Sequence, residues 1–480
     1  MRRSVNSYTS TPGESLTARL AAFVAEFRSE NIDAAAIMEA RRTLANYVGC
    51  VVAGSHHETT SRLLTTFRPY FGPPVASLFG RPERADPLHA AMINGTANNV
   101  YGFDDTHLDT IVHPGGPVLA ALFALSETHG FSGRVLLDAL VIGVDVSCRV
   151  ARALNTAHVD AGWHVSSTAG TYGAAAACAR VLGLTTAQVM QLFGTIASQP
   201  TGLRANFGTM TVSLHIGLAA RNGLAAALLA QTGFTSHENI LDLDDGWGKA
   251  LTSKLSAGKL VDGLGESFEI VLNSYKPYAS GVVTHPIIDG CRDLSEAHDL
   301  QAGQVAGVAL EVNPLVHELT GRLPTSTLRS KVSVQHAAAV GIARRAGGIA
   351  EFSEAMLSHP DIVRLRNIVT YKVDARLRPD EATVAITLAD GRVLNTHVEH
   401  ARGSRDRPMS DDDLRQKFMG LTAPILPDAQ AGHLFALCLA ADELASSAEI
   451  ATMACPMARG LANPMQIPKA FTQDRQAVRS

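Results

Sequence analysis

The chain has 480 residues, of which 46% are hydrophobic and 18% charged, and its formal net charge is -4. This length exceeds one typical domain, so we expect two domains with a large hydrophobic core. Because no overall positive charge attracts phosphates, the composition argues against a protein built to bind nucleic acid or an anionic membrane surface. A small anionic ligand would need a locally positive pocket.

Residues from about 16 to 270 have the pattern of successive helices. Ala and Leu dominate, and apolar residues recur at three- and four-residue spacing, as in 34–40. Thr185 and Gln188 form a capping-box pattern, which predicts a helix start at that point.

The pattern changes near residue 271. The segment 305–316 alternates and is rich in valine, as a strand would be, and 368–377 has the same character. The segment 381–400 predicts a hairpin with its turn at Asp390 and Gly391.

Helical character returns at Ser410, where a hydroxyl followed by three aspartates predicts a capped helix start. We therefore predict a mainly α fold, in which a large all-helical domain is interrupted by a smaller α+β domain. The predicted parts are the first helical part at 1–270, the inserted α+β domain at 271–405, and C-terminal helices at 406–480 that complete the helical domain.

Cysteine usage and the N-terminus bear on location. The six cysteines include no CxxC pair and lie mostly in apolar surroundings, which predicts buried free thiols in a reducing compartment. Residues 1–15 lack an apolar signal core. The most apolar run, 135–150, contains charged residues and favours a buried helix over a membrane span. We therefore expect a cytoplasmic protein without a membrane partner.

The first stretch that could carry chemistry is GFDDTHLDTIVHPGGP, residues 102–117. It places Asp104, Asp105, Thr106 and His113 in a loop between two apolar helices. Histidine exchanges protons near neutral pH, so the loop is a candidate for acid–base chemistry. The alternative is a solvated loop in which one of the aspartates caps a helix.

Two further stretches combine polar groups with helix starts. His164 stands beside hydroxyl residues before an Ala-rich helix, whose backbone N–H groups are suited to bind a carboxylate. Arg204 is a candidate for holding a carboxylate with two hydrogen bonds. The alternative for His164 is a packed side chain in a hydroxyl-rich cap. His215 lies within a helical pattern, where a hydrogen-bonded structural histidine is the favoured interpretation.

The last two stretches lie where the helical pattern gives way to the α+β region. Lys276, followed by His285, falls where an inter-domain cleft is expected, and a lysine there is suited to hold a carboxylate or stabilise an enolate-like charge. Lys331 and His336 open a helix and form a candidate anion site. For each of these groups the alternative is an ordinary solvated or surface position.

Metal and cofactor sites have characteristic ligand spacings, and none of the common ones occurs in this sequence. The sequence contains no HExxH motif, CxxC pair, P-loop, GxSxG or GxGxxG. The run 242–246 resembles the start of a calcium loop, but 247–256 contains no acidic residue to complete it. We therefore predict neither a metal nor a cofactor.

Together, in this order, the five stretches resemble the MmgE/PrpD family over roughly residues 16–455. The pieces that carry the resemblance are FDDTH…HPGGPV, HVSST, GTMT-x-SLHIGLAARNG, KPY…THPIIDG and KVSVQHAAAV. Known activities in that family include 2-methylcitrate dehydratase, cis-aconitate decarboxylase and iminodisuccinate epimerase. The resemblance implies a large helical domain with a smaller α+β lid, a homodimer and no metal.

The resemblance also implies roles for individual residues. The loop Asp and Thr of the family correspond to Asp105 and Thr106, with Asp104 adjacent. The two family histidines and the lysine correspond to His113, His164 and Lys276.

Three departures from the family pattern bear on the substrate. Gly102 stands where the decarboxylase branch commonly has Asp, and Val212 stands where the decarboxylase and dehydratase branches have Lys. His336 replaces a family Tyr. Losing an Asp and a Lys removes one opposite-charge pair, which favours a substrate with fewer carboxylates or one that is held differently.

These features predict a metal-independent lyase, of dehydratase or decarboxylase type, acting on a small di- or tricarboxylic acid. His113 or His164 would exchange the proton at the carbon next to a carboxylate, while Lys276 and Arg204 stabilise charge. Two alternatives stay open. One is an epimerase or isomerase of a small dicarboxylate such as iminodisuccinate, favoured by the added imidazole of His336. The other is a non-catalytic carboxylate-binding relative.

Overall fold

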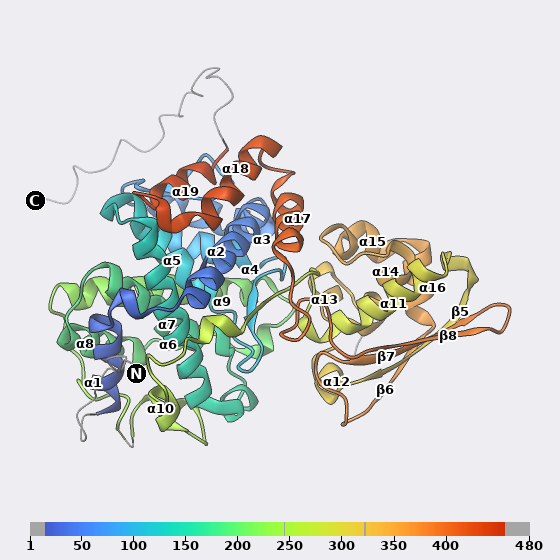
Figure 1. Ribbon diagram of the computed structural model, residues 1–480, viewed down its shortest axis with the longest axis horizontal. Coiled ribbons are helices and arrows are strands. Elements are labelled where there is room, and N and C mark those ends of the chain that lie inside the picture. Colours follow the sequence, from blue (N-terminus) through green and yellow to red (C-terminus); the bar gives the residue numbers. More distant parts are fainter. Residues whose placement is uncertain (1–14, 244, 321–322, 457–480) are drawn as a thin grey trace, which may run out of the picture.

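The computed structural model describes residues 15–243, 245–320 and 323–456. Three predictions fall partly outside the described residues. They concern the N-terminal segment 1–15, the calcium-like run 242–246 and the end of the C-terminal part 406–480. Helices hold 59% of the chain, which confirms the mainly α fold. Figure 1 shows a larger group of helices beside a smaller group that contains a sheet. We call them the helical body and the sheet body.

The helical body is built around α4, α5, α6, α7 and α9, which pack against one another. Small residues allow the closest crossings. A side chain at Gly143 would lie 2.8 Å from the Gly173 carbonyl oxygen, so glycine lets α6 and α7 meet at backbone distance. The elements are α1 (Leu16–Glu26), α2 (Ala34–Gly54), α3 (Glu58–Phe67), β1 (Ala76–Ser77), β2 (Arg84–Ala85), α4 (Pro87–Asn99), β3 (Asp105–His107), α5 (Gly115–His129), α6 (Gly133–Asp160), α7 (Val165–Val181), α8 (Thr186–Ala197), α9 (Met210–Gln231), α10 (Trp247–Leu251) and β4 (Asn273–Tyr275).

The sheet body holds a four-stranded sheet in the order β6-β5-β7-β8. β5 and β6 are parallel, and the other pairs are antiparallel. α11 packs on β7 and β8 and also on α14, and these elements share a second apolar core. The elements are α11 (His285–Ala297), β5 (Val305–Val312), α12 (Pro314–Thr320), α13 (Thr327–Ser330), α14 (Val334–Arg344), α15 (Glu354–Ser358), α16 (Pro360–Asn367), β6 (Val369–Val373), β7 (Ala382–Leu388) and β8 (Val393–Val398).

The segments 305–316 and 368–377 do form strands, but the observed strands β5 and β6 are shorter than predicted. The hairpin is confirmed: β7 pairs with β8, and Gly391 takes a φ of 87° in the turn. The strand predicted to reach residue 316 ends at Val312 instead. Asn313 Oδ1 accepts a hydrogen bond from Leu315 N at 2.9 Å, and Pro314, which lacks an N–H, starts α12.

The C-terminal helices return to the helical body, as Figure 1 shows. α17 (Asp411–Thr422) and α18 (Asp428–Leu439) pack on α2, and α19 (Ala448–Met453) packs on α5. The predicted cap at Ser410 is present, and so is the capping box at Thr185 and Gln188.

α9 is long and apolar enough to span a membrane by length and composition alone. However, 61% of its apolar window is buried inside the protein, where it packs against α4 and α7. Its apolar character is therefore accounted for by the protein core.

Candidate active site

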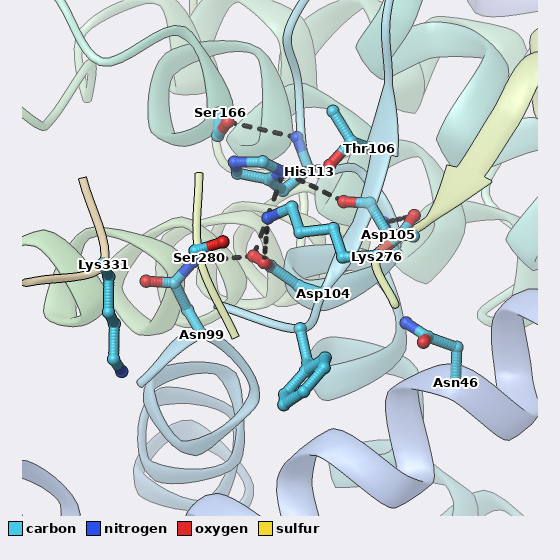
Figure 2. Close-up of polar contacts among 12 residues, drawn as sticks. Asn46, Asn99, Asp104, Asp105, Thr106, His113, Ser166, Lys276, Ser280 and Lys331 are labelled. Atoms are coloured by element: carbon cyan, nitrogen blue, oxygen red, sulfur yellow. Dashed lines mark hydrogen bonds and ion pairs between the residues drawn. The ribbon is translucent and has the colours of Figure 1, made fainter. Parts of the chain in front are cut away.

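Two short strands bring Asp104 and Lys276 together. β3 and β4 pair antiparallel, with Asp105 opposite Tyr275, so the residue before β3 lies beside the residue after β4. Lys276 Nζ donates a hydrogen bond to Asp104 Oδ1 at 2.6 Å. Both side chains are buried, and Figure 2 shows them at the centre of a polar group.

The second oxygen of Asp104 is also occupied. Asn99 Nδ2, at the end of α4, donates to Asp104 Oδ2 at 2.6 Å, and Ser213 Oγ of α9 donates to Asn99 Oδ1 at 2.9 Å. Burial raises the pKa of the Asp104 carboxyl, but His113 and Lys276 outweigh burial and lower it to about 2. Asp104 is therefore a fixed negative charge at neutral pH.

The hydrogen bonds of His113 determine which ring nitrogen is free. Its Nδ1 lies 2.9 Å from the Asp105 carbonyl oxygen and 3.0 Å from Thr106 Oγ1, and its backbone N donates to Ser166 Oγ at 3.1 Å. A carbonyl only accepts, so Nδ1 must hold the proton and Nε2 the lone pair. No described residue hydrogen-bonds to Nε2, and 21% of the side chain is exposed. Burial lowers the pKa of His113, so this nitrogen is an accessible neutral base.

Asp105 faces the start of α5. Its Oδ2 accepts hydrogen bonds from Gly115 N and from Asn273 Nδ2, each at 3.0 Å, while its buried Oδ1 has no partner among the described residues. A side chain at Gly115 would lie 2.7 Å from Oδ1, so this approach requires glycine. Burial and the charge of Asp104 raise the pKa of Asp105 to about 7.

This raised pKa makes stability depend on pH. An unperturbed Asp titrates near 3.8, so the folded protein binds a proton that the unfolded chain releases. The carboxyl therefore contributes stability that is present below about pH 4 and is lost as the pH rises through about 7. We expect Asp105→Asn to raise the free energy of unfolding by about 2–4 kcal/mol at about pH 8, since each pKa unit corresponds to roughly 1.4 kcal/mol.

Urea unfolding of wild type and Asp105→Asn at about pH 5 and about pH 8 measures this effect. The gain of the variant should shrink at the lower pH, where wild-type Asp105 is protonated. An equal difference at both pH values would show that Asp105 is not the titrating group.

The remaining predicted histidines occupy three different settings. His164 Nδ1 lies 3.1 Å from His215 Nδ1, and burial, His113 and His215 lower the pKa of His164 to about 3. His285 Nε2 lies 3.2 Å from the Ser280 carbonyl oxygen, and burial lowers its pKa to about 3. The structure thus places His164 near enough to His113 for the two rings to influence each other's pKa, and it fixes His285 within the segment that follows Lys276.

The structure does not bring His336 to this group. His336 Nε2 lies 2.8 Å from the Glu351 carbonyl oxygen, and its ring packs on Phe352 with centroids 5.3 Å apart. Its Nδ1 is buried without a partner among the described side chains. His336 therefore belongs to the interior of the sheet body.

Arg204 is held at a neighbouring loop. Its Nη1 donates to the Val159 carbonyl oxygen at 3.0 Å, and its charge contributes to the lowered pKa of His164. Binding a substrate carboxylate with both guanidinium arms would require this hydrogen bond to rearrange.

Two further lysines approach from other elements. Lys331, just after α13, donates to the Val100 carbonyl oxygen at 2.6 Å and lies over the Tyr101 ring, 5.1 Å from its centroid. Burial lowers the pKa of Lys331 to about 7. Lys417 of α17 donates to the Phe103 carbonyl oxygen at 2.8 Å, and burial lowers its pKa to about 8.

Sequence reasoning missed the residues that support the predicted ones. Asn99 stands at the end of an apolar helix, and that polar position was a usable signal. Lys417 lies 314 residues after its contact partner Phe103, and Asn273 lies 168 residues after its contact partner Asp105. No local pattern marks either one.

Among the described residues, Asp380, His400 and Asp406 also lie close enough together to share a cation. They flank the end of β8 in the sheet body and are partly solvent-accessible. No contact links them to Asp104, His113 or Lys276.

Comparison with known proteins places the sequence among relatives. Two family models match, the MmgE/PrpD N-terminal domain at residues 18–258 and the MmgE/PrpD C-terminal domain at residues 278–441. A protein of Homo sapiens named cis-aconitate decarboxylase is 27% identical over 418 residues, covering 81% of this chain and 84% of the relative. A cis-aconitate decarboxylase-like protein of Aspergillus oryzae is 25% identical over 446 residues, covering 87% of this chain and 92% of the relative.

Proposed function

The chain belongs to the MmgE/PrpD family, and from that premise we propose that it is a lyase of carboxy-lyase type acting on a small carboxylic acid. The observation that carries the proposal is the free Nε2 of His113 beside the buried Lys276–Asp104 pair. A neutral imidazole next to a fixed cation suits proton transfer at a carbon beside a carboxylate. The curated relatives named as cis-aconitate decarboxylases support the same class.

In the proposed reaction, the C–C bond to the departing carboxylate breaks and its electron pair stays on the carbon. CO2 leaves, and the carbon takes up one proton. Lys276 stabilises the negative charge that develops on the remaining acid. His113 Nε2 first takes up a proton that comes from solvent and then delivers it to the carbon, while Asp104 Oδ2, 4.0 Å from Nδ1, stabilises the imidazolium.

We propose that the reaction needs no metal. The support comes from the donor set of the site. Lys276 and Asn99 occupy the two oxygens of Asp104, and Gly115 and Asn273 donate to Asp105. This leaves Asp105 Oδ1 as the one oxygen of the two carboxylates without a partner among the described residues, and a single oxygen falls short of the ligand set that a divalent cation takes.

The substrate departs from the pattern of the named relatives in how its carboxylates are held. A side chain at Gly102 would meet nothing within 4 Å, so space is open where the decarboxylase branch has Asp. Lys331 has no carboxylate partner among the described residues. We propose that Lys331, which extends from the sheet body, binds a second carboxylate of the substrate. In this role it would substitute for the family lysine whose position is occupied by Val212 in this chain.

We also propose that the sheet body, predicted at 271–405, acts as a lid on this site. The hydrogen bond from Lys331 to Val100 joins the two bodies, and Arg329 packs on Gly208 from across the same boundary. A homodimer and a cytoplasmic location are further proposals, which rest on the resemblance and on cysteine usage.

The runner-up is an epimerase. His113 is partly buried and His164 is buried, and no described residue hydrogen-bonds to the Nε2 of either. Two bases on opposite sides of a carbon would suit inversion. The imidazole of His336 does not support this alternative, because that ring lies inside the sheet body.

Turnover in D2O distinguishes these functions. The purified protein is incubated with cis-aconitate, 2-methylcitrate and iminodisuccinate and followed by proton NMR. We expect one of these probes, or a close analogue, to lose CO2 or water. Deuterium in recovered substrate without such a product would favour the epimerase. No change in any acid, combined with measurable binding, would favour a non-catalytic relative.

A further inference from the structure

A pair of histidines lies beside the proposed active site. His164 precedes α7 and His215 belongs to α9, and their Nδ1 atoms face each other at 3.1 Å. Only 7% of His164 and 3% of His215 is exposed. The ring planes are tilted by 54°, with centroids 5.3 Å apart. Two ring nitrogens at this distance attract each other only when a proton lies between them.

The surroundings hold both rings in place. Gly202 has a φ of 96°, and a side chain there would lie 3.2 Å from His164 Cβ and 3.2 Å from His215 Cγ. The Gly202 carbonyl oxygen accepts a hydrogen bond from His164 N at 3.0 Å. Ser167 Oγ donates to the His215 carbonyl oxygen at 3.0 Å, and Phe207 packs edge-on against His164.

The number of protons in this pair is limited. Burial lowers the pKa of both histidines, so each ring is neutral near pH 7 and has a single N–H. One Nδ1 then donates and the other accepts. It follows that of the two outer Nε2 atoms, one has a proton and the other has a lone pair.

We propose that His215 is a positioning residue that sets the tautomer of His164 and relays its proton. In the starting state, His215 Nδ1 donates its proton to His164 Nδ1, and His164 has its own proton on Nε2. His164 Nε2 gives that proton to the active site, where the proposed reaction consumes one, the Nδ1 proton of His215 passes to His164 Nδ1, and His215 Nε2 takes a proton from water. One proton enters and one leaves, and both rings end neutral in the opposite tautomer.

The relay would let His164 transfer a proton without becoming a buried ion. A charged imidazole at this position is disfavoured by burial and by nearby His113. The catalytic part of the proposal rests on the proposed function, whereas the paired tautomers do not depend on it.

The first test observes the tautomers directly. Full-length protein labelled with 15N-histidine is studied by long-range 1H–15N correlation near pH 7, with His164→Gln and His215→Gln used for assignment. We expect two neutral rings in opposite tautomers, and a changed His164 pattern in His215→Phe. Identical tautomers, or a cationic ring, would overturn the proposal.

The second test uses cis-aconitate as the probe. His215→Phe keeps a similar ring volume without nitrogens, and His215→Asn restores an amide near the position of Nδ1. We expect His215→Phe to lower kcat at least about tenfold with little change in KM, and His215→Asn to recover part of it. His433→Phe, the same substitution at an exposed position of α18, is the matched control and should stay close to wild type.

Equal kcat in His215→Phe and wild type would overturn the relay. If wild type turns over none of the probes, the proposed function fails, while the NMR result still decides whether the histidines form the proposed pair.

Discussion

Replacing His113 by glutamine should lower kcat by about 10²- to 10⁴-fold, the usual contribution of a positioned acid–base group. Glutamine can keep a hydrogen bond to the Asp105 carbonyl oxygen, but it cannot take or deliver a proton near neutral pH. The backbone hydrogen bond from residue 113 to Ser166 does not depend on the side chain. Steady-state kinetics, with thermal unfolding to check the fold, measures this effect.

His129→Gln is the control for this substitution. His129 lies in the last turn of α5, exposed and outside the polar group, so its replacement should leave kcat unchanged. If His113→Gln retains kcat within about tenfold of wild type, His113 is not the acid–base group.

Replacing Lys276 by methionine should destabilise the protein by about 3–5 kcal/mol, because it leaves the buried Asp104 carboxylate without its cation. Lys276 is 5% exposed and Asp104 is fully buried, so water cannot replace the lost partner. Turnover should also fall, since the cation that stabilises the developing charge is gone. Urea unfolding at neutral pH gives the change in the free energy of unfolding.

The double variant Asp104→Asn with Lys276→Met separates stability from catalysis. Removing both charges should recover most of the lost stability, since no unpaired buried ion remains. Turnover should stay low in the double variant. Wild-type stability in Lys276→Met alone would show that the ion pair does not hold the site together.

Local signals in the sequence predicted local structure well. The caps at Thr185 and Ser410 depend on residues within one helical turn, and both are present. The hairpin at Gly391 depends on a turn that only a few residue types adopt. The predicted end of the strand at residue 316 was wrong. The prediction followed the alternation of apolar residues, whereas Asn313 and Pro314 start a helix at this point.

The site was predictable only in part, because its contacts join distant segments. Lys276 and Asp104 are 172 residues apart, and the β3–β4 pairing that joins them has no sequence signature of its own. Resemblance to a family suggested both residues, but not their ion pair. For His336 the sequence suggested a site residue that the structure does not place in the site. Its position in the motif suggested a site role, whereas the structure packs it on Phe352.

His215 shows a third kind of limit. Its helical context favoured a structural histidine, and its backbone and burial fit that view. Its contact with His164 Nδ1 depends on how α9 packs beside the start of α7, which the sequence pattern does not specify.

The central claim is that the group around His113 and Lys276 performs proton-coupled chemistry on a small carboxylic acid. The most direct test compares wild type and His113→Gln with cis-aconitate in D2O, followed by NMR and mass spectrometry of the product. We predict that wild type releases CO2 and places one solvent deuterium on the carbon that lost it, while His113→Gln forms almost no product. Equal turnover by both proteins, or a product without solvent deuterium, would contradict the claim.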